Sequence, residues 1–185
     1  VHTIPQVEID SVKLTPGKHS IIAVNAPQGY LTLKMSGTSI KNVDKIKAIV
    51  RKKDEMKTLN LQDFNQTEKY ITGSYDLEVL CLPRLFINDV DVFQSSTTTV
   101  EIPQPGIAVL QMSANGYGSL YKFSDNKLEW IYNLRENTMQ ESIVLQPGSY
   151  KVVFRTKYTN RAAYTVEKTF KVESNASITV KLFQN

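Results

Sequence analysis

Apolar and polar residues alternate through most of the chain, and a period of two is the pattern of a half-buried β-strand. In one run, Tyr75, Leu77 and Val79 alternate with Asp76 and Glu78. The same alternation recurs at Val90 and Val92, at Tyr150, Val152 and Phe154, at Phe170 and Val172, and at Leu128, Trp130, Tyr132 and Leu134. The two most helix-like windows, 43–56 and 135–142, lack caps and a sustained apolar stripe. The pattern therefore predicts an all-β chain.

Turn signals separate these runs at regular intervals. They are the pairs Pro16-Gly17, Gln28-Gly29, Thr72-Gly73, Pro105-Gly106, Asn115-Gly116 and Pro147-Gly148. Glycine adopts positive φ at little cost, and proline fixes the preceding turn position. Short strands divided by such turns predict antiparallel Greek-key-type β-sandwiches.

Three matched segments, in the same order and at nearly the same offset, reveal an internal duplication. The strand that follows Gly29 is repeated after Gly106, and the Gly73-Ser74-Tyr75 start is repeated as Gly148-Ser149-Tyr150. The strand pair 90–102 is repeated at 170–182. We therefore expect a tandem pair of sandwiches of about seven strands each, at 26–102 and 103–185.

A third, partial copy precedes them. Residues 12–24 resemble the strand pairs 92–102 and 172–182, which close the two full units. We expect residues 1–25 to be extra N-terminal strands, either the closing strands of a preceding unit or an addition to the first sandwich. The chain starts at Val1 and not at Met, which favours a processed or excised piece of a longer protein.

Composition narrows the function classes only slightly. The 185 residues are 41% hydrophobic and 22% charged, and no apolar run approaches the ~20 residues of a transmembrane helix. The net charge of +4 comes mainly from basic residues between Lys41 and Lys57. We interpret that cluster as a solvated strand and hairpin tip and expect no nucleic-acid partner, because no nucleic-acid motif accompanies it.

Residues that could carry chemistry are few. Cys81 is the only cysteine, and its apolar neighbours predict a buried structural thiol. The two histidines, His2 and His19, lack metal-ligand spacing. Asp89 and Asp91 alternate on one strand, but calcium needs ~6–8 oxygen ligands, so a solvent-facing edge is favoured. We predict no enzyme activity, no cofactor and no metal site.

Aromatic residues are the remaining candidates, because sugars stack on exposed aromatic faces. The candidate ligand residues all lie in the second repeat: Tyr117, Tyr121, Trp130 and Tyr158. Trp130 and Tyr132 are in register with Leu128, which favours core packing over a sugar platform. Tyr117, between two glycines, is the candidate expected to be most exposed. The repeated tyrosines Tyr75 and Tyr150 are interpreted as core residues whose hydroxyls bond to a turn.

The residues of the repeat also resemble a known group. A Gly-led strand, a Gly-Ser-Tyr-led long strand and a closing Val-x-Ile/Leu strand resemble PEGA and carboxypeptidase-regulatory-like (prealbumin-like) sandwiches. The amino-acid sequence of residues 70–84 and 97–106 is similar to that of C-terminal repeats of bacterial von Willebrand factor A proteins labelled as calcium-activated chloride channel homologues. The resemblance implies an exported, periplasmic or cell-surface accessory region. The Asp-x-Ser-x-Ser metal motif of the von Willebrand domain is absent from this sequence.

Together these features predict a non-catalytic accessory module, a spacer or docking region of a larger cell-envelope protein. Its expected partners are other domains of the parent chain or envelope proteins, and edge strands offer a route to a homodimer. The alternative is a carbohydrate-binding module that uses the aromatics of the second repeat, with a glycan as partner.

Overall fold

We describe the fold from a computed structural model of the chain. The structure describes residues 3–37, 46–125, 127–157 and 165–183. The chain divides into two compact units. The first comprises Val1–Lys34, Ile46–Leu80 and Phe86–Glu101, and the second comprises Met35–Lys45, Cys81–Leu85 and Ile102–Asn185.

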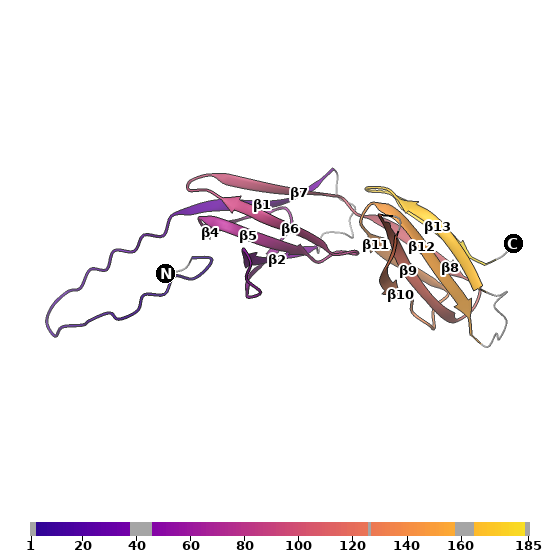
Figure 1. Cartoon of the computed structure of the whole chain (residues 1–185), viewed down its shortest axis with the longest axis horizontal. Coiled ribbons are helices and arrows are strands. Elements are labelled where there is room, and N and C mark those ends of the chain that lie inside the picture. The colour runs from indigo at the N-terminus through magenta and orange to yellow at the C-terminus, as the bar shows by residue number, and fades with distance from the viewer. Residues whose placement is uncertain (1–2, 38–45, 126, 158–164, 184–185) are drawn as a thin grey trace. The chain divides into compact units, whose positions relative to one another are not determined.

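The first seven strands form two sheets (Figure 1). They are β1 (Gln28–Ser36), β2 (Lys47–Lys52), β3 (Thr58–Asp63), β4 (Gln66–Ile71), β5 (Gly73–Val79), β6 (Leu85–Val92) and β7 (Thr97–Pro103). One sheet has the order β4-β1-β7 and the other the order β3-β2-β5-β6.

The last seven strands repeat this topology strand for strand. They are β8 (Gly106–Met112), β9 (Gly116–Ser124), β10 (Lys127–Asn133), β11 (Gln140–Leu145), β12 (Gly148–Thr156), β13 (Thr165–Val172) and β14 (Ser177–Leu182). Their sheets have the orders β11-β8-β14 and β10-β9-β12-β13. The predicted all-β tandem of sandwiches is therefore confirmed, as is the β-sandwich class that the family resemblance implies. One detail differs, because β14 pairs with β8 in parallel.

Each unit has a core built from the inward residues of both sheets. In the second unit, the core cluster includes Leu110, Leu120, Val152, Phe154 and Leu182, all nearly inaccessible to solvent. The alternation predicted Val152 and Phe154 at such positions, because one face of each strand must be buried. Within the described parts of the chain, no helix is long and apolar enough to cross a membrane.

The repeated tyrosines hold equivalent turns in the two units. The Tyr75 hydroxyl donates to the carbonyl of Ile71 at 2.6 Å, and the Tyr150 hydroxyl donates to that of Gln146 at 2.5 Å. Both rings are buried, which confirms their predicted role in the core. Burial raises the pKa of Tyr75 to about 12 and also raises the pKa of Tyr150, because a buried phenolate would lose its hydration.

The described part of the basic cluster forms a strand and a hairpin, as predicted, and several of its charges are paired locally. Within β2, Lys47 pairs with Asp63 at 3.0 Å and Arg51 with Glu78 at 2.7 Å. Lys53, in the following turn, pairs with Asp89 of β6. Lys41 and Lys45 lie outside the described residues.

The N-terminal segment differs from the full units. Residues 3–27 contain no strand, and Figure 1 draws most of them as an extended loop. They therefore add no strand to the sheets of the first sandwich. Their origin as closing strands of a preceding unit stays a prediction, as do the limits 26–102 and 103–185.

Candidate functional site

The candidate site lies on the outward face of the four-stranded sheet β10-β9-β12-β13. Along β9, Leu120 points into the core and is fully buried, so Tyr117, Ser119 and Tyr121 point outward. Gly118 allows a close approach from inside, since a Cβ atom there would lie 2.6 Å from Leu134 Cδ1. The Gly-Tyr-Gly sequence thus presents Tyr117 while the backbone packs tightly behind it.

A register shift in β10 decides which of its residues face outward. Trp130 pairs with the outward Tyr121, but the next paired residue, Tyr132, lies opposite the inward Leu120. Ile131 is the extra residue of this bulge, which reverses the facing of the strand after it. Leu128 and Trp130 therefore face outward, while Tyr132 and Leu134 face inward.

The expectation that Trp130 packs in the core is therefore wrong. Its side chain is 57% exposed, and Leu128 is exposed as well. Core packing is found for the other two residues of the predicted strand face: Leu134 is buried, and Tyr132 packs against the core cluster. The Tyr132 hydroxyl donates to Glu141 Oε1 at 2.7 Å, and this hydrogen bond raises the pKa of Tyr132.

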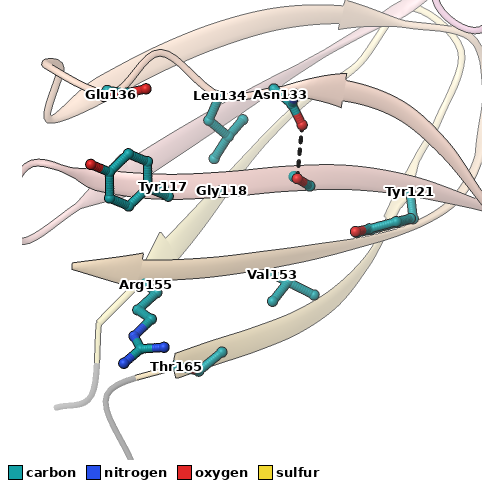
Figure 2. Close-up of a pocket in the computed structure, with 10 residues that line it drawn as sticks. Tyr117, Gly118, Tyr121, Asn133, Leu134, Glu136, Val153, Arg155 and Thr165 are labelled. Carbon is teal, nitrogen blue, oxygen red and sulfur yellow. Dashed lines mark hydrogen bonds between the residues drawn. The ribbon is translucent and has the colours of Figure 1, made fainter. Parts of the chain in front are cut away.

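Asn133 holds the indole of Trp130 in place. Its Oδ1 accepts a 2.9 Å hydrogen bond from Trp130 Nε1 and a 2.8 Å bond from Ser119 Oγ. Figure 2 shows the bond between Asn133 and β9. The Asn133 side-chain amide nitrogen has no partner within the described part of the chain. The aromatic group is thus fixed, and a hydrogen-bond donor stands beside it.

A hollow of about 390 Å³ lies beside these residues. It is lined by Tyr117, Gly118, Ser119, Tyr121, Asn133, Leu134, Glu136, Val153, Arg155 and Thr165. Tyr117 and Arg155 lie towards one end and Tyr121 towards the other (Figure 2). This volume falls in the range of small-molecule sites, which is roughly 300–1,000 Å³.

The Tyr117 end of the hollow carries charge. Tyr117 is 56% exposed, which confirms the expectation that it is an exposed aromatic. Lys157 Nζ lies 5.3 Å from its ring centroid and pairs with Glu136 at 2.9 Å. Arg155 is the cross-strand partner of Tyr117. Aromatic faces and charged hydrogen-bonding groups therefore meet at one place.

The structure brings together three of the four predicted ligand residues, Tyr117, Tyr121 and Trp130. Tyr158 lies outside the described residues. The alternation and the turn signals did not indicate Asn133 or Arg155 as site residues. The outward alternation of Tyr117, Ser119 and Tyr121 signals this face, but the position of Asn133 depends on the bulge.

The other chemical candidates are less suited to a site. Cys81 follows the end of β5 and does not lie in a strand, and it is half-buried where full burial was expected. Its Sγ donates to the Pro83 carbonyl at 3.1 Å, and burial raises the pKa of the thiol. Asp89 pairs with Lys53, and Asp91 accepts a hydrogen bond from Ser74. The described ranges hold no group of three or more His, Cys, Asp or Glu side chains suited to a metal.

No family model matches the chain, and no curated protein matches it. Three solved structures resemble it at low identity. The Bacillus anthracis TIE protein is 11% identical with a TM-score of 0.31, over 84% of this chain and 33% of that one. The minor pilin GBS52 of Streptococcus agalactiae is 12% identical with a TM-score of 0.32, over 83% and 94%. The pilus adhesin SpaC of Lactobacillus rhamnosus GG is 10% identical with a TM-score of 0.27, over 80% and 26%. The chain thus spans about a third of the TIE protein.

Proposed function

We propose that this chain is a non-catalytic carbohydrate-binding module, and that the outward face of β10-β9-β12 is its ligand surface. The observation that carries the proposal is the exposed indole of Trp130, which Asn133 fixes beside Tyr121. An exposed tryptophan held in one orientation loses little conformational entropy when a ligand stacks on it.

The chemistry of the face fits a sugar better than a purely apolar ligand. A pyranose ring has an apolar C–H face that packs on an aromatic ring, and hydroxyls at its edge that need hydrogen-bond partners. Trp130, Tyr121 and Tyr117 supply aromatic faces. The two tyrosines line the hollow together with Asn133 and Arg155, whose amide and guanidinium groups supply donors. Trp130 adjoins the hollow through its hydrogen bond to Asn133.

The carboxylates around the hollow support binding without hydrolysis. Glycoside hydrolysis generally uses two carboxyl groups that flank the scissile bond. Of the described residues that line the hollow, only Glu136 carries a carboxylate, and it pairs with Lys157. Glu141 lies nearby in sequence but is buried and accepts bonds from the Tyr132 hydroxyl and the Arg135 backbone N–H.

A spacer role is the second candidate, and the repeated topology favours it. Two units with the same strand order repeat one structural element within the chain, as in proteins built from repeats. In this proposal the units belong to a longer exported cell-envelope protein that carries a von Willebrand factor A domain, as the resemblance of 70–84 and 97–106 implies. The sequence of the complete parent protein tests that association.

The test of the glycan proposal is binding of the full chain to a glycan array and to insoluble polysaccharides. We expect saturable binding that weakens about tenfold or more in Trp130→Ala, a loss of about 1.4 kcal/mol or more. Phe86→Ala is the matched control, because Phe86 is an aromatic of the first unit with 66% exposure. Equal effects of the two substitutions, or no saturable binding to any glycan, would refute the proposal and leave the spacer role.

A further inference from the structure

Residues 15–18 repeat the turn that joins the last two strands of each unit. In all three places, a backbone N–H donates to the carbonyl three residues earlier, at 3.2, 3.3 and 3.3 Å. The donors are Lys18, Ser96 and Ala176, and the acceptors are Thr15, Phe93 and Glu173. The residue before each donor has positive φ, namely Gly17 at 72°, Ser95 at 54° and Asn175 at 58°. The N-terminal segment therefore has the turn of a β6–β7 hairpin although it forms no strand.

Gly17 and Ser95 are separated by 78 residues in the sequence (95 − 17). Two further features of the N-terminal segment match β6 and β7 at this same offset. Ser11 has a φ of 61°, and Asp89, its counterpart in β6, has a φ of 59°. The Ser20 hydroxyl donates to the Lys13 carbonyl at 3.5 Å, just as the Thr98 hydroxyl donates to the Asp91 carbonyl at 2.6 Å. Left-handed φ is rare outside glycine, so its recurrence at matched positions is a specific signal.

The chain just before the hairpin is also bonded in a repeated way. The Ile71 N–H donates to the carbonyl of Ile4 at 2.7 Å, and the Gln146 N–H donates to that of Leu82 at 2.7 Å. Ile71 and Gln146 occupy equivalent places, because each lies just before a repeated strand that contains a tyrosine, β5 or β12. Ile4 and Leu82 are separated by the same offset of 78 residues (82 − 4). The correspondence therefore extends over residues 4–20.

This segment has apolar residues at the positions that are buried in the β6–β7 and β13–β14 hairpins, but here these residues do not pack against a core. Val12, Leu14 and Val24 are all exposed, and Leu14 is 83% exposed. Their counterparts Val90, Val92 and Ile102 in the first unit are buried, with Val92 only 2% exposed. In the second unit, the counterparts Phe170, Val172 and Leu182 belong to the core cluster, together with residues of β8, β9 and β12.

We propose that residues 5–24 form the sixth and seventh strands of a further sandwich when a five-stranded body equivalent to β1–β5 is present, and that their apolar face then covers this body. The two complete units show what covers these positions, since the same hairpin packs on such a body in the second unit. A hairpin is stabilised when its apolar side chains are removed from water, and an isolated hairpin has no surface on which to bury them. The apolar side chains of residues 5–24 therefore need such a body to pack against. The partner is thus a body of the same repeat and not an unrelated ligand.

A fusion that keeps the whole present chain tests the proposal. Residues 26–78 are placed directly before Val1, because Val1 corresponds to Val79, and amide hydrogen exchange is followed by NMR. We expect amides within 7–24 to exchange at least about 100-fold more slowly in the fusion than in the chain alone. The amides of the two complete units serve as the internal reference. Equal exchange rates of residues 7–24 in both proteins would overturn the proposal.

Two substitutions distinguish burial from general ordering. Leu14→Asp should leave the chain alone unchanged but abolish the protection of residues 7–24 in the fusion. Ile21→Asp is the matched control, because Ile21 is 96% exposed and its counterparts Thr99 and Thr179 are exposed in the complete units. It should preserve the protection. An equal effect of the two substitutions in the fusion would contradict packing of this apolar face on a body.

Discussion

Replacing Gly106 by alanine perturbs the start of β8, where the strand passes close to the hairpin that closes the second unit. A Cβ atom at Gly106 would lie 2.7 Å from Val172 Cγ1 and 2.8 Å from the Ala176 carbonyl oxygen. It would also collide with the Glu173 carbonyl oxygen. Two of these contacts are with backbone atoms, which cannot rotate away as a side chain can. The strand must therefore shift outward.

The expected cost follows from three contributions. Overpacking of a tight site costs about 1–3 kcal/mol. The shift also stretches the 2.8 Å hydrogen bond from the Ile107 N–H to the Ala176 carbonyl, which contributes about 1 kcal/mol. Alanine offsets roughly 0.4–1 kcal/mol by restricting the unfolded chain. We therefore expect Gly106→Ala to lower the free energy of unfolding by about 1–3.5 kcal/mol, which is roughly 5–25 °C in Tm for a unit of this size.

Differential scanning calorimetry measures this change, and fluorescence of Trp130, the only tryptophan, reports the second unit. Gly148→Ala is the matched control in the same unit, because a Cβ atom there meets nothing closer than 3.6 Å. The control should change Tm by only a few degrees. A loss below about 0.5 kcal/mol for Gly106→Ala, or equal losses for the two variants, would refute the packing argument.

Three further predictions follow from the buried polar groups. Tyr150→Phe should lower the free energy of unfolding by about 1–3 kcal/mol in chemical denaturation, because the Gln146 carbonyl loses its donor; an unchanged value would count against it. Burial raises the pKa of Tyr75 to about 12, so its stabilising contribution is present below pH ~10 and is lost as the pH rises through 12. Absorbance titration at alkaline pH checks this, and complete ionisation of all tyrosines near pH 10 would contradict it. Cys81 should react slowly with thiol reagents at neutral pH and quickly after denaturation, because burial raises its pKa; fast labelling of the folded protein would exclude this account.

The duplicated fold is well predicted by sequence because its signals are local and repeated. Gly29 and Gly106 recur since each strand passes close to a backbone carbonyl, of Phe93 and of Glu173 respectively. Tyr150 recurs for the same kind of reason, since its hydroxyl satisfies a buried carbonyl at a turn. Such requirements leave the same residue at the same place in both copies.

The ligand face is harder to predict, because one extra residue reverses it. Leu128, Trp130 and Leu134 follow a regular period of two, and the pattern alone assigns them to one face. The bulge at Ile131 depends on the pairing of β10 with β9, which periodicity does not reveal. The hydrogen bond between Trp130 and Asn133 likewise forms only after the bulge has set the register.

An NMR titration of the isotope-labelled chain with soluble oligosaccharides, namely hexaoses of cellulose, chitin, xylan and mannan, tests directly whether the Trp130 face binds a glycan. We expect saturable shifts of the Trp130 indole N–H and the Asn133 side-chain amide with at least one of these oligosaccharides. Resonances around the exposed Phe86 should stay unchanged. Absence of saturable shifts at Trp130 with every oligosaccharide, or shifts confined to other surfaces, would contradict a glycan site on this face.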